Sequence, residues 1–226
     1  RGARRDLHSG AFGGVAPNPI QALGWLLARL KDEGTGRVLI PGFYERVRPV
    51  PEEEKALWPS LDEEALKREL GVEILPGEEG YAPLERLWAR PTLDPNGIWG
   101  GYQGEGSKTV IPAEAGMKLS MRLVPDQDPE EVPELLRRHL EAQGFHDVEV
   151  VVLEKGERPA RSDLAHPFVA LARRALEEAF GERPVLYPNM AGSGPMHPFL
   201  HHLKAPAVGL GVGYPGSRVH SPNEHI

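Results

Sequence analysis

The 226-residue chain has 40% hydrophobic residues and a formal charge of −7, an ordinary globular composition whose acidic balance, with no basic stripe, argues against a nucleic-acid partner. Cysteine is absent, which excludes disulfides, thiolate nucleophiles and zinc–thiolate sites. The length fits one or two domains, and the lack of cysteine suits a cytoplasmic protein. No apolar run reaches membrane-spanning length, so we expect no membrane partner.

Two amphipathic helices are predicted in the first two thirds of the chain. In the first, Asn18 supplies a cap and Pro19 takes the first helical position. Its apolar face consists of Ile20, Leu23, Leu26, Leu27 and Leu30. The second is expected to start at Asp128, with Pro129 first and Glu131 at the capping-box position.

Strands are predicted around these helices. Apolar and polar residues alternate over 117–123 and 148–152, and residues 98–102 and 4–8 are expected to form the remaining strands. The order strand, helix, strand, strand, helix, strand predicts a ferredoxin-like α+β domain with an antiparallel sheet. We assign residues 1–158 to this domain and interpret about 37–95 as an insertion containing a helix capped by Ser60.

The last part of the chain predicts a piece of a second domain. Residues 158–163 resemble a linker, and a helix is expected to start at His166-Pro167 and end before Gly181. Residues 205–213 are apolar and rich in glycine, which favours a buried parallel strand. One such strand cannot complete a domain, so residues 159–226 are expected to be an incomplete part of an α/β domain.

Three residues could carry chemistry, although each pattern is weak alone. His8 follows a strand in a glycine-flanked turn that could present its side chain, but a surface-loop histidine is the simpler interpretation. Arg122 could grip a carboxylate through two parallel hydrogen bonds, or could be an exposed strand arginine. His220 follows the predicted buried strand, where ligands often lie, and the interpretations as metal ligand and as loop histidine remain open.

Other patterns in the sequence favour simpler interpretations. His197 and His201 would share a helix face, with His202 beside them, but the run lacks the glutamate of the zincin pattern, so we predict a partly exposed helix. The turn at Gly192 and Ser193 could offer backbone N–H groups to an anion. The glycine-rich residues 104–109 lack both Walker spacing and a following helix, which argues against a nucleotide site.

Taken in order, several segments resemble the M20 metallopeptidases, especially the branch of nonspecific dipeptidases and carnosinases. They are Arg5-Asp6-Leu7-His8-Ser9-Gly10 with Gly13-Gly14, Ile40-Pro41-Gly42-Phe43, Lys108-Thr109-Val110-Ile111-Pro112, Arg122-Leu123-Val124-Pro125-Asp126-Gln127, Gly192-Ser193-Gly194 and His220-Ser221-Pro222-Asn223-Glu224. Each segment is a weak signal alone, but together they span nearly the whole chain in the family's order.

The resemblance implies a lid domain inserted into a di-metal α/β domain, with homodimers formed through the lids. It implies that His8 stabilises the oxyanion in the partner's active site, that Arg122 binds the substrate carboxylate, and that His220 is a metal ligand. The pocket around Arg122 would be completed by Thr109, Gly192 and Ser193. No ligand role is implied for the three histidines at 197–202.

The chain also departs from the family. The His-x-Asp motif, the bridging Asp and the Glu-Glu pair are absent, and the first residue is not methionine, so we expect this chain to be part of a longer protein and inactive alone. The intact dimer would hydrolyse dipeptides or short peptides using two zinc or manganese ions. The alternatives are an N-acyl-amino-acid deacylase of the same superfamily and a non-catalytic dimerisation or binding module.

Overall fold

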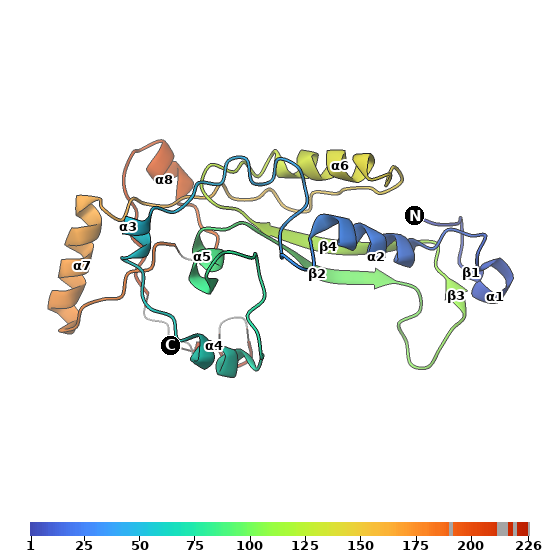
Figure 1. Cartoon of the computed structure of the whole chain (residues 1–226), viewed down its shortest axis with the longest axis horizontal. Helices are drawn as coiled ribbons and strands as arrows, with labels where there is room; N and C mark the ends of the chain where they lie inside the picture. The colour runs from blue at the N-terminus through green and yellow to red at the C-terminus, as the bar shows by residue number, and fades with distance from the viewer. Residues whose placement is uncertain (190–191, 212–216, 219–220, 226) are drawn as a thin grey trace.

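The computed structural model describes residues 1–189, 192–211, 217–218 and 221–225. The molecule is elongated, with β1 and β3 at one end, β2, β4, α2 and α6 in the middle, and α7 and α8 towards the other end (Figure 1). The strands are β1 Leu7–His8, β2 Thr92–Gly100, β3 Val110–Ile111 and β4 Ala115–Arg122. The helices are α1 Ser9–Phe12, α2 Pro19–Leu30, α3 Glu52–Lys55, α4 Glu63–Leu70, α5 Pro83–Trp88, α6 Val132–Ala142, α7 Pro167–Phe180 and α8 His197–His201.

The middle of the molecule is built on the antiparallel pair β2 and β4. The pair has one irregularity, between Pro95 and Gly97, where proline has no N–H to give to the ladder. β4 confirms the predicted strand at 117–123, whereas β2 begins at Thr92, well before the predicted start at 98. β1 and β3 form a separate two-stranded sheet, so the described strands make two small sheets.

Helices α2 and α6 cover this strand pair and enclose the main core with it. The cap on α2 is as predicted, since Asn18 Oδ1 accepts a hydrogen bond from the Ile20 N–H at 3.0 Å. Ile20 itself is exposed, but the rest of the predicted face turns inward. The core cluster contains Leu26 and Leu30 of α2, Leu93 of β2, and Val132, Leu136 and Leu140 of α6.

Two local predictions about the second helix and the strand after it are wrong. α6 begins at Val132, because Asp128 Oδ1 accepts the Glu130 N–H at 2.9 Å and closes a turn of its own before the helix. Residues 148–152 form no strand. Val148 and Val150 nevertheless pack against the core cluster. The alternating pattern therefore reflects which side chains face the core, although the segment pairs with no strand.

Residues 37–95 carry three helices, and a buried carboxylate ties the two ends of this segment together. Glu78 accepts two hydrogen bonds of 2.7 Å from Arg90 and one of 3.1 Å from Arg37. The Arg90 guanidinium also lies 4.1 Å from the centre of the Tyr81 ring. The short helix α4 is capped by Asp62, whose Oδ1 accepts the Ala65 N–H, and so the predicted cap at Ser60 is wrong.

A tryptophan fills the space beside a glycine across the central strand pair. Trp99 of β2 lies opposite Gly116 of β4. The indole lies so close over Gly116 that a Cβ at that position would overlap the ring. Nearly half of the Trp99 side chain remains exposed on the other side.

The C-terminal part is only partly as predicted. His166 caps α7, its Nδ1 accepting the Phe168 N–H at 3.1 Å, and Gly181 ends the helix with a positive φ of 74°. Residues 205–211 form no strand, and Ala207 instead exchanges hydrogen bonds with the Ser162 hydroxyl. Within the described ranges, no helix is both long and apolar enough for a membrane crossing.

Candidate functional site

The sheet of β1 and β3 brings His8 beside Thr109. The pair His8–Val110 is in register, and the Ser9 N–H donates to the Thr109 carbonyl at 3.0 Å. The two side chains then lie 3.3 Å apart, measured from His8 Nε2 to Thr109 Oγ1. Both residues are exposed, at the end of the molecule formed by β1, β3 and α1 (Figure 1).

The turn after His8 also fixes the chemistry of its ring. His8 Nδ1 accepts the Gly10 N–H at 3.0 Å. In a neutral imidazole one nitrogen accepts and the other carries the proton, so this contact places the proton on Nε2. His8 can therefore donate a hydrogen bond from Nε2, to Thr109 Oγ1 in this structure or to a developing negative charge.

Arg122 and Ser193 form a second pair. Arg122 ends β4, and its Nη1 donates to Ser193 Oγ at 2.8 Å. The contact joins the central strand pair to the Gly192-Ser193 turn that leads into α8. Arg122, Gly192 and Ser193 are all exposed. A guanidinium has five N–H donors in a planar fork, so it can hold a serine hydroxyl and a carboxylate together.

The two pairs are far apart within one chain. β4 runs from Ala115 to Arg122, seven residue steps of about 3.3 Å each, so its ends are about 23 Å apart. Thr109 lies beyond the Ala115 end, beside His8, while Arg122 lies at the other end. The expectation that Thr109 lines the same pocket as Arg122 therefore does not hold within a single chain.

The described residues do not assemble a metal centre. Within the described ranges, no group of three or more His, Asp or Glu side chains is placed to hold a metal ion. His220, the predicted ligand, lies outside the described residues. The helix predicted around His197 and His201 is present as α8.

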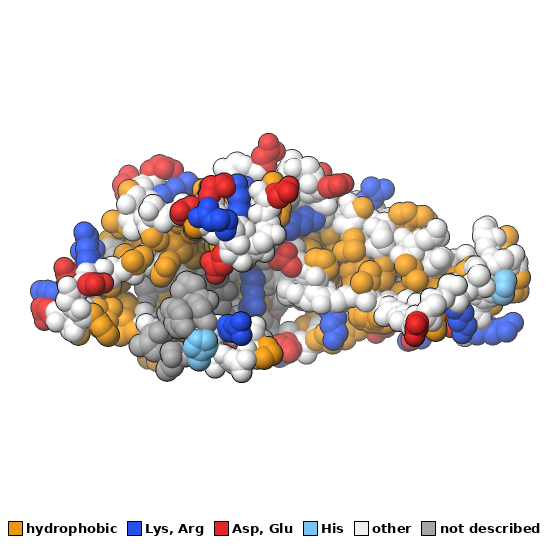
Figure 2. All heavy atoms as spheres, turned by 90° about the horizontal axis from the view of Figure 1, so that it is seen from below, with side chains coloured by type: hydrophobic (Ala, Val, Ile, Leu, Met, Phe, Trp, Pro, Cys, Tyr) orange, Lys and Arg blue, Asp and Glu red, His pale blue; other side chains and the backbone are white. Residues whose placement is uncertain are grey.

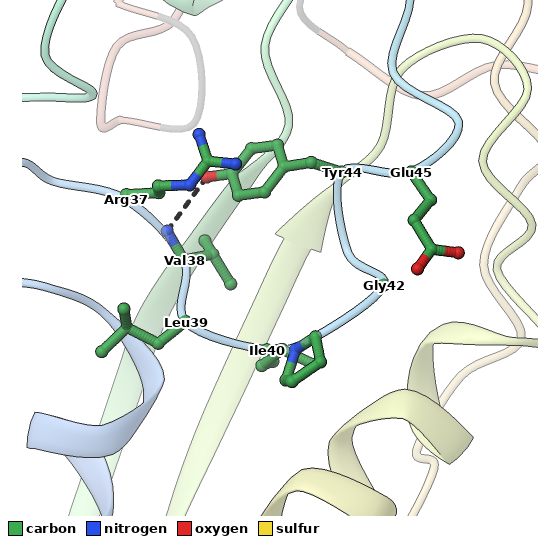
Figure 3. A pocket seen from close by; sticks show the side chains of 8 residues that line it. Arg37, Val38, Leu39, Ile40, Gly42, Tyr44 and Glu45 are labelled. Carbon is green, nitrogen blue, oxygen red and sulfur yellow. Dashed lines mark hydrogen bonds between the residues drawn. The ribbon is translucent and has the colours of Figure 1, made fainter.

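A surface hollow of about 480 Å³ is lined by residues 37–42 with Tyr44 and Glu45, and no residue of the two pairs lines it. Figure 3 shows the Tyr44 ring across it, with the hydroxyl oxygen accepting the Val38 N–H at 2.9 Å. The Arg37 guanidinium lies 4.2 Å from the centre of the same ring. Burial is the main cause that raises the pKa of the Tyr44 hydroxyl, so it stays neutral and serves as a hydrogen-bonding group of the loop.

Comparison with known proteins identifies the family. The sequence profile of the peptidase dimerisation domain of M20 peptidases matches residues 1–148. The chain belongs to the M20 peptidase family. It is 33% identical over 233 residues to the Beta-Ala-His dipeptidase of Rattus norvegicus, covering 98% of this chain and 46% of that protein. It is 32% identical to the Cys-Gly metallodipeptidase DUG1 of Saccharomyces cerevisiae, covering 100% of this chain and 48% of DUG1.

A solved M20 structure has the same fold over nearly the whole chain. The M20 family metallo-carboxypeptidase Sso-CP2 of Sulfolobus solfataricus superposes with a TM-score of 0.87 at 37% identity, covering 98% of this chain and 51% of that one. The chain thus spans about half the length of the M20 relatives that it matches.

Two of the motifs that resemble the M20 family have a structural role that the sequence did not reveal. Gln127 is buried, its Oε1 accepts the Val124 N–H at 2.9 Å, and its Nε2 donates to the Phe43 carbonyl at 2.7 Å. Phe43 is itself buried in the core. Gln127 therefore ties the segment after Arg122 to the 40–43 loop, and the only sequence signal for it was a polar residue within an apolar motif.

Proposed function

We propose that the intact protein is a homodimeric, metal-dependent dipeptidase. The observation that carries the proposal is the separation of the His8–Thr109 pair from the Arg122–Ser193 pair by about 23 Å along β4. One chain cannot bring both pairs to one substrate, but two chains can if each contributes one pair. The names of the relatives, which are dipeptidases for Beta-Ala-His and Cys-Gly, support the substrate class.

In this mechanism each pair has one task. The His8 imidazole of one subunit donates from Nε2 to the oxyanion that forms when the peptide carbonyl is attacked in the partner's site. Thr109 Oγ1, 3.3 Å from that nitrogen, holds the ring in place until the oxyanion takes over the hydrogen bond. Arg122 of the other subunit binds the free C-terminal carboxylate of the substrate, with Gly192 and Ser193 at its side.

Divalent metal ions, zinc or manganese, would supply the Lewis acid and the activated water in such an enzyme. His220 is the one ligand that we propose from this chain, by resemblance alone. The remaining ligands of a two-metal centre would come from other parts of the protein, because the described residues contain no such group.

The homodimer would form through α2 and β2. Among the described residues, β2 has a strand on one side only, so its other edge can receive a partner. Large exposed hydrophobic side chains lie on these two elements, namely Ile20 and Trp25 of α2 and Ile98 and Trp99 of β2. Figure 2 shows hydrophobic side chains gathered right of centre, over the part of the molecule that contains α2 and β2. Patches of this kind mark interfaces.

Three finer expectations belong to the same proposal. Residues 1–158 would form a ferredoxin-like lid, supported by α2 and α6 on the strand pair and by Val148 and Val150 packed beside them. Residues 159–226 would belong to the catalytic domain. A cytoplasmic location is supported by the absence of cysteine from the sequence.

Subunit mixing tests the proposal in the full-length enzyme. His8→Ala and Arg122→Ala subunits should each form inactive dimers, because every site lacks one group. Half of a random mixture is heterodimer, and one of its two sites is intact, so about a quarter of the wild-type activity should return.

The matched control mixes His8→Ala with Thr109→Ala. In this heterodimer one site lacks His8 and the other has His8 without Thr109, so the mixture should be no more active than the average of its two parent dimers. Heterodimers that form but stay as inactive as the His8→Ala parent in the first mixture would refute action between subunits. Hydrolysis of N-acyl amino acids faster than dipeptides would instead favour the deacylase alternative.

A further inference from the structure

The histidines of α8 form a cluster that the proposed function does not use. His197 and His201 lie one turn apart, and their rings are stacked with centroids 4.8 Å apart. His202 follows, with its ring centroid 5.1 Å from that of His201. His201 and His202 are exposed and His197 is half-buried, so water and ions reach the cluster.

The spacing of the stacked pair suits a metal chelate. A zinc–nitrogen bond is about 2.0–2.1 Å, which puts the centroids of two imidazoles bound to one ion about 4.5–5.2 Å apart at ligand angles between about 90° and 109°. The His197–His201 separation falls in that range. The rings are stacked and nearly parallel, so both side chains must rotate about χ1 and χ2 to turn one nitrogen of each ring towards a common ion.

A positively charged side chain lies near one of the two rings. The positive charge of Lys204, followed by desolvation and by neighbouring His197 and His202, lowers the pKa of the His201 imidazole. The Lys204 charge also repels a cation, but His201 and Lys204 are both exposed, where water and salt screen that repulsion.

We propose that His197 and His201 form a surface site for a borderline divalent transition-metal ion such as Zn²⁺, Ni²⁺ or Cu²⁺. It is a two-histidine chelate completed by water, since the described residues hold no preformed group of three or more ligands. The site lies in the helix that follows the Gly192-Ser193 turn, and Arg122 and Ser193 take no part in it.

Zinc titration of the protein tests the site. His197→Asn and His201→Asn should each lower the Zn²⁺ association constant of this site at pH 7.5 by about tenfold or more, because each removes a direct ligand. The double variant should be no weaker than the singles, since neither half chelates alone. His146→Asn is the matched control: it removes another exposed histidine outside α8 and should leave Zn²⁺ binding unchanged.

A second readout is independent of activity and of any other metal centre. Untagged protein should be retained on immobilised Ni²⁺ at pH 7.5 and released by free imidazole, which competes for the metal. His201→Asn should elute earlier than His146→Asn. Zinc binding and Ni²⁺ retention that are the same in His201→Asn and wild type, or that fall equally in His146→Asn, would overturn the proposal.

Discussion

Replacing Glu78 by glutamine should destabilise the protein more than most single substitutions. The Glu78 side chain is 8% exposed and that of Arg90 is 9% exposed, and the two share two hydrogen bonds of 2.7 Å. Glutamine keeps the shape but removes the charge and one acceptor, which leaves the Arg90 guanidinium buried without a counter-ion. Breaking a buried ion pair in this way costs about 3–5 kcal/mol.

That range corresponds to a fall in Tm of about 6–20 °C for a protein of this size. Urea unfolding followed by circular dichroism would measure the free energy. The matched control is Arg37→Gln, which removes a contact to the same carboxylate from a side chain that is 52% exposed, and should cost about 1 kcal/mol or less. Equal losses in the two variants would refute the argument, because burial would then not set the strength of the contact.

Three further substitutions have expected outcomes. Gln127→Ala should lower the free energy of unfolding by about 2–3 kcal/mol in urea melts, because it leaves the Val124 N–H and the Phe43 carbonyl buried without partners. The Glu130 N–H, together with Arg158, lowers the pKa of Asp128 below 3.8. Ionised Asp128 therefore contributes to the free energy of unfolding above pH 3.8, and this contribution is lost as the pH falls through the lowered pKa. Asp128→Asn should flatten the loss of stability below about pH 4, as acid titration of the folded fraction would measure. Trp25→Glu should shift sedimentation towards monomer, and an unchanged dimer would place the interface elsewhere.

The sequence predicted local structure correctly where the contacts that determine it lie between residues close in sequence. The cap at Asn18, the helix start at His166-Pro167 and the alternation in β4 concern residues close in sequence, and all three predictions are confirmed. The predicted strands at 148–152 and 205–213 needed partners from elsewhere, and over the described residues neither forms. Pattern alone shows which side of a segment is buried but does not supply the neighbouring strand.

The candidate site was predictable residue by residue but not as an arrangement. His8, Thr109, Arg122 and Ser193 were all chosen from the sequence, yet their grouping depends on contacts across 101 and 71 positions. The register of β1 with β3 decides that Thr109 accompanies His8. A register between such distant segments follows from the whole fold, which no local motif contains.

Because Trp99 packs over Gly116, the substitutions that each of these two positions tolerates depend on the residue at the other. Any larger residue at 116 would push the indole off the strand pair, and the displaced ring would change the surface presented by β2. Loss of Trp99 alone would uncover a glycine that lowers the strand's own stability. Single substitutions at either position should therefore destabilise the strand pair. A mutational scan that varies both positions together should recover folded combinations that a scan of single substitutions would miss.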